Sequence, residues 1–370
     1  MIPVTRPWLP ARASLDKYID GIYERRWLTN NGPLVQTLTE RLQQWLGVDN
    51  LLLVGNGTLA LQIAYRALGV TPPDRQPVEA VTTPFSFIAT ASSLRWEGID
   101  PVFADIDSHT WCLDPEQAAK AITPATRAIV PVHVFGNACD VAAFDQLARA
   151  HQIRLIYDGA HAFGVQHAGK SLLSYGDACT LSFHATKLFH SIEGGAIIFR
   201  HEEDLHTARQ MINFGITGPD SIGSLGINAK MNEFQAAMGL CVLDELDQQQ
   251  PARAETWNSY HAALKGKLTL QRQTPQSTCN HAYFPLLLDS EAELLHCMQA
   301  LTEHGIQTRR YFHPSLDSLD WLNPGPALPV SRDVSSRVLC LPLFADLPPE
   351  QAETIARLLL TSRADFHRAR

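Results

Sequence analysis

Short apolar segments alternate with amphipathic segments through the first half of this 370-residue chain, and this alternation constrains its fold most strongly. Most of these apolar runs are separated by segments whose apolar residues have helical spacing, for example 59–68 and 141–150. Strands that alternate with helices are typical of βαβ units and of a largely parallel sheet covered on both faces. We therefore predict an α/β fold whose strands lie at 51–54, 78–82, 101–104, 128–132, 155–157, 178–183 and 196–199.

Segments on either side of this region complete the predicted architecture. Two helical patterns, at 14–27 and 33–45, precede it. A long helix is expected over 233–247, and Pro251 is expected to break it, because proline removes a backbone donor and clashes inside a helix. Beyond it, one strand-like run at 283–288 is followed by another helix and then by the segment 309–312. We predict a large domain over residues 1–247 and a smaller C-terminal α+β domain over 248–370.

Composition excludes several classes of protein. The net charge is −8 and no basic stripe is visible, which argues against nucleic-acid binding. No window approaches the ~18 apolar residues of a membrane span, and the proline-rich start does not resemble a signal peptide. Seven widely spaced cysteines form no CxxC pair, so we expect a reduced, cytoplasmic protein. The segment 201–206 places its second histidine one position too late for the zinc motif HExxH, so no metal site is predicted.

The first candidate site is the sequence GNGTLA at 55–60, which follows an apolar run and opens a helix. Glycines let the backbone approach an anion, and a helix N-terminus offers unpaired N–H groups. Three interpretations stay open for this stretch alone: a phosphate site, the turn of a nicotinamide-binding domain, and a tight structural turn.

Two further candidates are a carboxylate and a lysine. Asp158 ends an apolar run, at the edge where α/β proteins bind ligands, and His161 follows it closely. Lys187 lies between the runs that end at Phe183 and begin at Ala196, where loss of solvent would lower its pKa and make it a nucleophile. An anion site, a carboxylate and a buried lysine match the phosphate, ring nitrogen and aldehyde of pyridoxal 5'-phosphate.

These residues belong to longer motifs, and with them the chain resembles the DegT/DnrJ/EryC1/StrS sugar aminotransferases nearly end to end. The most specific motifs are SFHATK at 182–187 and EGGAI at 193–197. The others are NNGP (30–33), NGTLAL (56–61), TPFSFIATA (83–91), PVFADID (101–107), DGAHAFG (158–164) and GINAKMNEFQAAMG (226–239). The resemblance implies a fold-type I, pyridoxal-phosphate-dependent aminotransferase.

The resemblance also assigns roles in binding the cofactor. Lys187 would be the catalytic residue, which holds the cofactor covalently and later moves a proton. Asp158 would pair with the ring nitrogen, His161 would lie beside the ring oxygen, and Phe87 would stack on the ring. The phosphate would be held by Gly57, Thr58, Ser182 and, from a second subunit, Asn228. This last role implies a homodimer with shared active sites.

A second group of residues is expected to bind the substrate. Lys230 stands where the family commonly has an arginine, and lysine lacks the fork that binds carboxylate or phosphate with two hydrogen bonds. Arg309 or Arg310 could replace it. The full set of substrate candidates is Asn31, His184, Lys230, Arg309, Tyr311 and His313.

The resemblance is closest to the branch that makes dTDP-4-amino-4,6-dideoxy-D-glucose, and it implies a dTDP-linked 4-keto-6-deoxyhexose as acceptor and L-glutamate as amino donor. One alternative is a related aminotransferase acting on a 3-keto, GDP-linked or UDP-linked sugar. A dehydratase of this fold resembles the family but has histidine in place of the lysine, and Lys187 argues against it. An NAD-dependent oxidoreductase is supported only by the glycine pattern at 55–60. A non-catalytic regulatory relative is the last alternative.

Overall fold

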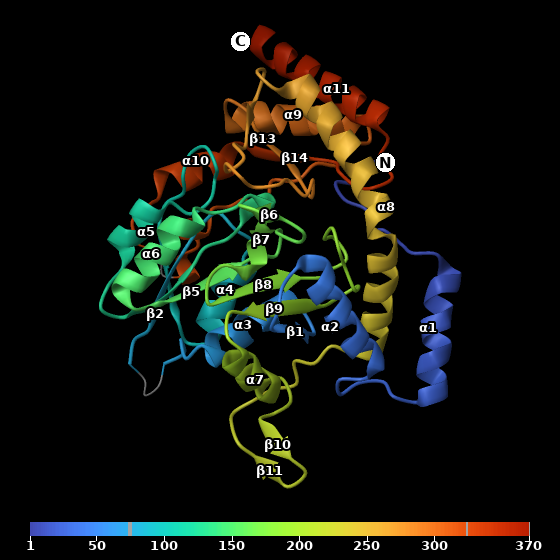
Figure 1. Cartoon of the computed structure of the whole chain (residues 1–370). Helices are drawn as coiled ribbons and strands as arrows, with labels where there is room; N and C mark the ends of the chain where they lie inside the picture. Colours follow the sequence, from blue (N-terminus) through green and yellow to red (C-terminus); the bar gives the residue numbers. More distant parts are fainter. Residues whose placement is uncertain (73–75, 323–324, 370) are drawn as a thin grey trace.

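The computed structural model describes residues 1–72, 76–322 and 325–369, and its centre is a seven-stranded sheet (Figure 1). The strand order is β1-β9-β8-β5-β4-β2-β3. Strand β9 runs antiparallel to both of its neighbours, and every other pair is parallel, which confirms the predicted α/β class. The strands are β1 (Leu51–Val54), β2 (Glu79–Thr82), β3 (Asp100–Phe103), β4 (Thr126–Val130), β5 (Arg154–Asp158), β8 (Ala178–Ser182) and β9 (Gly195–Phe199).

Helices cover both faces of this sheet. Successive residues of β1 point to opposite faces, so that Leu51 and Leu53 join one apolar cluster and Leu52 and Val54 the other. The first cluster includes side chains from α2 (Pro33–Leu46), α5 (Pro115–Ala121), α6 (Val141–His151) and α8 (Glu233–Leu264). The second includes side chains from α3 (Gly57–Ala67), α4 (Ala89–Trp96) and α7 (Glu202–Met211).

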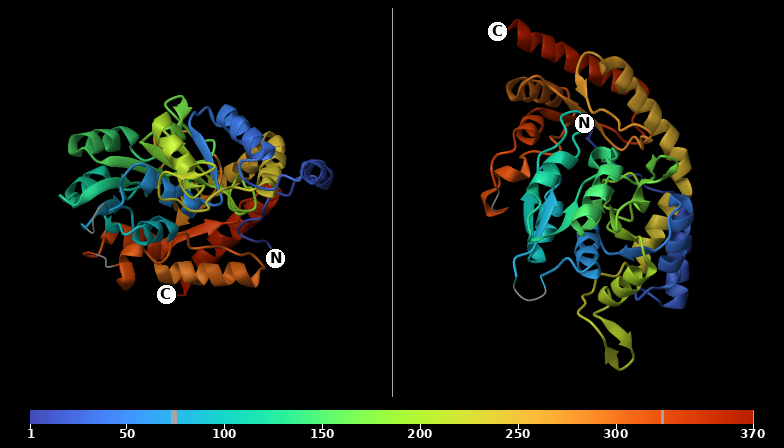
Figure 2. Two further views of the ribbon diagram at one scale, coloured as in Figure 1. Left: turned by 90° about the horizontal axis from the view of Figure 1, so that it is seen from below. Right: turned by 60° about the vertical axis from the view of Figure 1, so that its left-hand side comes forward.

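Helix α8 contradicts the prediction that Pro251 ends the helix near residue 247. The helix runs on to Leu264, with Pro251 inside it and exposed to solvent. It passes from α2 and α1 (Arg12–Arg25) to the C-terminal helix α11 (Pro349–Arg368) (Figures 1 and 2). Leu243 is buried in the first of the two clusters that flank the sheet, and Tyr260 is buried in a separate cluster in the C-terminal part. Packing at both ends therefore outweighs the missing hydrogen bond, and the predicted domain boundary lies inside a helix.

The C-terminal part has its own buried cluster and a three-stranded antiparallel sheet. In the segment 309–312 only Arg309 pairs with that sheet, through Cys340, before the chain turns away. No helix in the described ranges is long and apolar enough to span a membrane. The C-terminal elements are β12 (Thr269–Leu270), β13 (Phe284–Leu287), α9 (Glu291–Glu303), η3 (Leu316–Ser318), η4 (Asp320–Leu322), α10 (Pro329–Arg337), β14 (Val338–Leu341) and α11.

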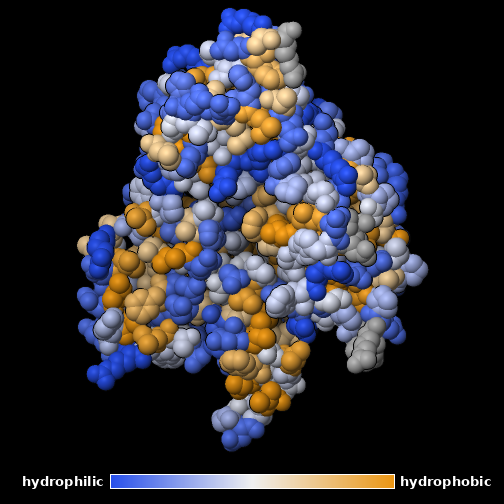
Figure 3. Space-filling view, turned by 180° about the vertical axis from the view of Figure 1, so that it is seen from behind, coloured by the Kyte–Doolittle hydropathy of each residue, from blue (hydrophilic) through white to orange (hydrophobic). Residues whose placement is uncertain are grey.

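A small hairpin, β10 (Ile216–Gly218) and β11 (Ser221–Ile222), projects from the lower end of the molecule in Figure 1. Apolar side chains gather on this projection in the space-filling view (Figure 3). The remaining short elements are η1 (Val134–Gly136), β6 (Gln166–His167), β7 (Lys170–Ser171) and η2 (Leu172–Ser174).

Candidate active site

A cavity of about 700 Å³ lies at the carboxyl ends of β5 and β8. Its wall combines the start of α3, the ends of these two strands, the loop after β8 and the C-terminal segment around 309–312. This edge of the sheet is where open α/β folds bind ligands. Ten of the predicted site residues line it: Gly57, Thr58, Phe87, Asp158, His161, Ser182, His184, Lys187, Arg309 and Tyr311.

The other four predicted residues lie elsewhere in this subunit. Asn31 and Lys230 line a second cavity, of about 620 Å³, in which Lys230 Nζ donates a hydrogen bond to Asn213 Oδ1 at 2.8 Å. Asn228 and His313 are exposed and line neither cavity. The structure thus brings the expected cofactor residues together except Asn228, which the resemblance assigns to a second subunit.

The start of α3 forms an anion-binding corner. The Asn56 side chain caps the helix by accepting a hydrogen bond from Leu59 N at 2.9 Å. A Cβ atom on Gly57 would lie only 2.8 Å from Ser182 Cβ, so glycine is required for this close approach. Gly57 therefore lies against Ser182 at the N-terminus of α3, which is the positive end of the helix dipole.

Asp158 is a buried carboxylate at the end of β5, with only 6% of its surface exposed. It accepts hydrogen bonds from Thr90 Oγ1 at 2.7 Å and from Ala160 N at 3.1 Å. No cation lies at ion-pair distance from it within the described ranges. Burial raises its pKa, although these hydrogen bonds and the charge of Lys187 oppose the shift.

Lys187 carries its amine into the same cavity. Its Nζ donates a hydrogen bond to the Tyr283 hydroxyl at 3.4 Å. Burial lowers the pKa of Lys187 to about 8, and the charge of Asp158 only partly opposes this shift. About a tenth of the amine is therefore neutral at pH 7, far more than for an ordinary lysine, and the neutral form is the one that attacks a carbonyl group.

Aromatic side chains form the rest of the wall. His161 Nδ1 accepts a hydrogen bond from Phe135 N at 3.1 Å, and its ring lies parallel to that of Phe312 with centroids 5.6 Å apart. Burial lowers the pKa of His161, which keeps the imidazole neutral. Phe87 leaves 58% of its surface exposed at the cavity, so its ring is available to stack on a ligand.

These features fit pyridoxal phosphate. The corner at α3 suits a phosphate group, and the unpaired, buried carboxylate of Asp158 suits a protonated ring nitrogen. The amine of Lys187, whose pKa is lowered by burial, suits the aldehyde. Two observations support this fit. Asp158 is buried with no cation at ion-pair distance in the described part of the chain, and Gly57 leaves space next to Ser182 that a side chain would fill.

Sequence reasoning missed three contributors to this site. Tyr283 was expected only as the start of a strand, yet its hydroxyl contacts Lys187. Thr90, which binds Asp158, lies in the TPFSFIATA motif but was given no role. Phe312 packs beside His161. Only position within a motif could have signalled Thr90, and no sequence signal marked the other two.

Comparisons with known proteins support this assignment. The model of the DegT/DnrJ/EryC1/StrS aminotransferase family matches residues 11–360. Over 359 residues the chain is 40% identical to a dTDP-4-amino-4,6-dideoxy-D-glucose transaminase of Shigella dysenteriae, covering 95% of this chain and 96% of the relative. A protein with the same name from Escherichia coli is 35% identical over 97% of this chain and 98% of its own length. A crystal structure of DesI, described as solved in the presence of its TDP-sugar product, superposes with a TM-score of 0.91 at 34% identity, covering 100% of this chain and 95% of DesI.

Proposed function

This chain belongs to the DegT/DnrJ/EryC1/StrS aminotransferase family, whose members depend on pyridoxal phosphate, and on that premise we propose its substrates. It transfers an amino group from L-glutamate to C4 of dTDP-4-keto-6-deoxy-D-glucose and forms dTDP-4-amino-4,6-dideoxy-D-glucose. The names of the two relatives at 40% and 35% identity support this acceptor. The observation that carries the chemistry is the buried amine of Lys187 in one cavity with the unpaired carboxylate of Asp158.

The cofactor residues act as follows in this proposal. When bound, pyridoxal phosphate supplies an electron sink for the carbon that gains or loses the amino group. Asp158 holds a proton on the ring nitrogen by charge, and Gly57, Thr58 and Ser182 bind the phosphate. Lys187 Nζ moves the proton, because a pKa near 8 lets it both accept and release one near neutrality.

Arg309 is the proposed partner for an anionic group of the substrate. It lines the cavity, and it makes no side-chain hydrogen bond or ion pair with any other residue that the structure describes. Arg310 cannot take this role, since its Nη2 already donates to Glu291 at 2.6 Å and to the Ser336 carbonyl at 3.0 Å. His184 and Tyr311 also face the cavity and complete the substrate side of the site.

A homodimer is part of the proposal. Asn228 is exposed and lies outside its own cavity, so it would bind phosphate only in a second subunit. It stands next to the apolar projection of Figure 3, which includes the exposed side chains of Phe214, Ile216, Ile222, Leu225 and Ile227. A contiguous apolar surface of this kind marks an interaction site. Sedimentation of the purified protein should therefore show twice the 41.0 kDa mass of one chain, and a monomer would contradict the dimer.

A cytoplasmic location is also proposed. All seven cysteines are free and six of them are buried, as expected for a protein that folds in a reducing compartment.

The proposed reaction can be tested directly. Purified protein loaded with pyridoxal phosphate is incubated with L-glutamate and dTDP-4-keto-6-deoxy-D-glucose, and NMR of the product determines the configuration at C4. We expect the gluco product, and no conversion by Lys187→Ala. No conversion by the wild type, or formation of the galacto product, would contradict the proposed substrate. Parallel incubations with GDP-linked and UDP-linked keto sugars test the alternative nucleotides.

A further inference from the structure

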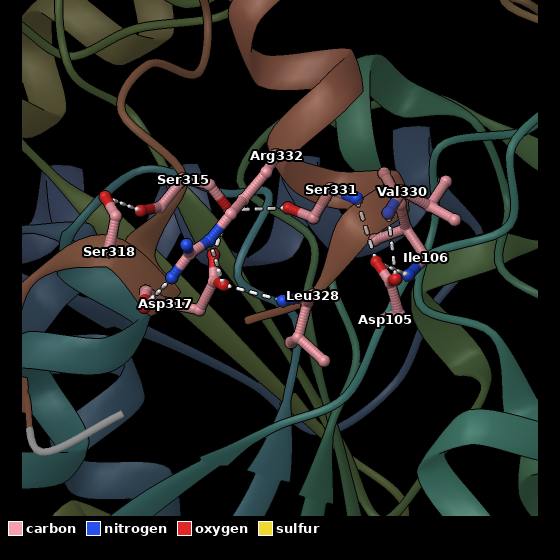
Figure 4. A network of polar contacts seen from close by, with 9 residues as sticks. All are labelled: Asp105, Ile106, Ser315, Asp317, Ser318, Leu328, Val330, Ser331 and Arg332. Carbon is pink, nitrogen blue, oxygen red and sulfur yellow. Dashed lines mark hydrogen bonds and ion pairs between the residues drawn. The ribbon is translucent and has the colours of Figure 1, made fainter. Parts of the chain in front are cut away.

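Asp105 caps a helix that lies 225 residues away along the chain. It follows β3 and is 7% exposed. Its Oδ2 accepts a hydrogen bond from Val330 N at 3.0 Å and its Oδ1 accepts one from Ser331 N at 2.8 Å (Figure 4). These two N–H groups open α10, and the residue before that helix, Leu328, offers no side-chain cap. The position of α10 is thereby tied to the central sheet.

Helix α10 in turn holds the segment that leads into the cavity. Ser335 Oγ donates a hydrogen bond to the Phe312 carbonyl at 2.6 Å. The hydroxyls of Ser331 and Ser315 lie 2.7 Å apart (Figure 4). Phe312 lines the cavity, and Arg309 and Tyr311 on the same segment line it too. A continuous chain of contacts therefore leads from Asp105 through α10 to the substrate side of the site.

We propose that Asp105 is a positioning residue for substrate binding: through α10 it sets where Arg309 and Tyr311 stand in the cavity. Asp105 itself does not line the cavity. A carboxylate suits this task, because it satisfies two N–H groups of a buried helix end and adds a favourable interaction with the helix dipole. Without it the helix start would lose both partners, and the segment 309–312, which Cys340 also holds at Arg309, would lose its link to the central sheet through α10.

The inference rests on the proposed function, and steady-state kinetics of substituted holoenzymes test it. Arg309→Gln first identifies which substrate, the sugar nucleotide or glutamate, Arg309 binds, as the one whose KM rises. Asp105→Ala should then raise the KM of that same substrate about tenfold, with kcat changed less than about twofold, because small displacements of a positioned group weaken binding strongly. Asp105→Asn, which keeps one acceptor, should give a smaller rise.

Two further variants separate positioning from stability alone. Asp140→Ala removes a helix cap from α6, where Asp140 accepts a hydrogen bond from Ala143 N at 3.0 Å, and should leave both KM values unchanged. Ser335→Ala breaks the contact between α10 and Phe312, and should raise the same KM as Asp105→Ala. The double variant should show less than the product of the two single effects, because both act through α10.

The outcomes separate the inference from the proposed function. If the wild-type protein turns over but Asp105→Ala keeps both KM values, or raises only the KM that Arg309→Gln leaves unchanged, the positioning role is overturned. The same conclusion follows if Asp105→Ala matches the wild type in three measurements. These are the absorbance spectrum of the bound cofactor, the binding of the probe dTDP in calorimetry, and both KM values. No turnover by the wild type contradicts the proposed substrates instead, and calorimetry with dTDP and glutamate then tests Asp105 through binding alone.

Discussion

Asp158 is a site residue whose buried carboxylate lowers the free energy of unfolding of the protein but serves its function. Its carboxylate is buried without a cation at ion-pair distance in the described part of the chain, and burial raises its pKa. We predict that Asp158→Asn raises the free energy of unfolding of the cofactor-free protein by about 1–2 kcal/mol at pH 7. Asparagine keeps the contacts to Thr90 and Ala160 but cannot hold a proton on the ring nitrogen, so turnover should fall at least about a hundredfold.

Urea unfolding at several pH values checks the stability effect of Asp158→Asn. The raised pKa means that the folded protein binds a proton more tightly there than the unfolded chain does, so the wild type gains stability as the pH falls through that pKa. The advantage of the variant should therefore be largest at neutral pH and shrink in acid. A variant less stable than the wild type at pH 7 would contradict this account of Asp158.

The amine of Lys187 gives a second prediction at this scale. Its pKa of about 8 sets the fraction that is neutral and able to react with an aldehyde. The rate at which cofactor-free protein captures pyridoxal phosphate should rise as the pH increases through about 8 and level off above it. Stopped-flow absorbance measures this rate, and Lys187→Ala is the control that should show no capture. A midpoint above 10 would show that the amine is solvated.

Local motifs and the family resemblance together predicted the site well, because ten of the fourteen predicted residues line the cavity. Asp158 and Lys187 were predictable because a carboxylate at a strand end and a lysine between two buried runs carry their chemistry in local sequence. Tyr283 was not predictable, since it meets Lys187 across 96 residues of chain and only tertiary packing brings the two together. The roles proposed for Asn228 and Lys230 stay predictions.

Helix α8 contains a proline that should lower the stability of the protein. Pro251 lies exposed within it, where it supplies no N–H for the helix and contributes little packing. We predict that Pro251→Ala increases the free energy of unfolding by about 1–3 kcal/mol. Chemical denaturation measures the change, with Gln250→Ala as a neighbouring control that restores no hydrogen bond. A loss of stability would show that the proline at this position is required by the tertiary packing.

Helix α8 also shows where local sequence patterns no longer predict the ends of helices and strands. Apolar period and turn residues placed all seven strands of the central sheet, although the predicted run at 128–132 begins two residues after β4 does. Local rules failed at Pro251, where contacts from distant segments decide the conformation. Buried residues at both ends hold α8 together.

At the scale of the whole molecule, a protein of net charge −8 must bind two phosphorylated ligands. Local placement resolves this conflict, because the cavity gathers the start of α3, Lys187 and Arg309. The proposed second subunit would add Asn228 to the phosphate end. Shared sites then predict that two defective chains can complement each other when each supplies the residue that the other lacks.

Mixing Lys187→Ala with Asn228→Ala tests this sharing. Asn228 is exposed, so its loss should leave the fold intact while weakening phosphate binding. In a mixed dimer one site combines Lys187 from one chain with Asn228 from the other, so an equal mixture should regain about a quarter of the wild-type rate at limiting cofactor. The matched control mixes Lys187→Ala with Asp158→Asn. Both of these residues line the same subunit's cavity, so no mixed site is complete and no recovery is expected. Recovery in both mixtures, or in neither, would contradict a site built from two subunits, because only an Asn228 that crosses the interface makes the two mixtures differ.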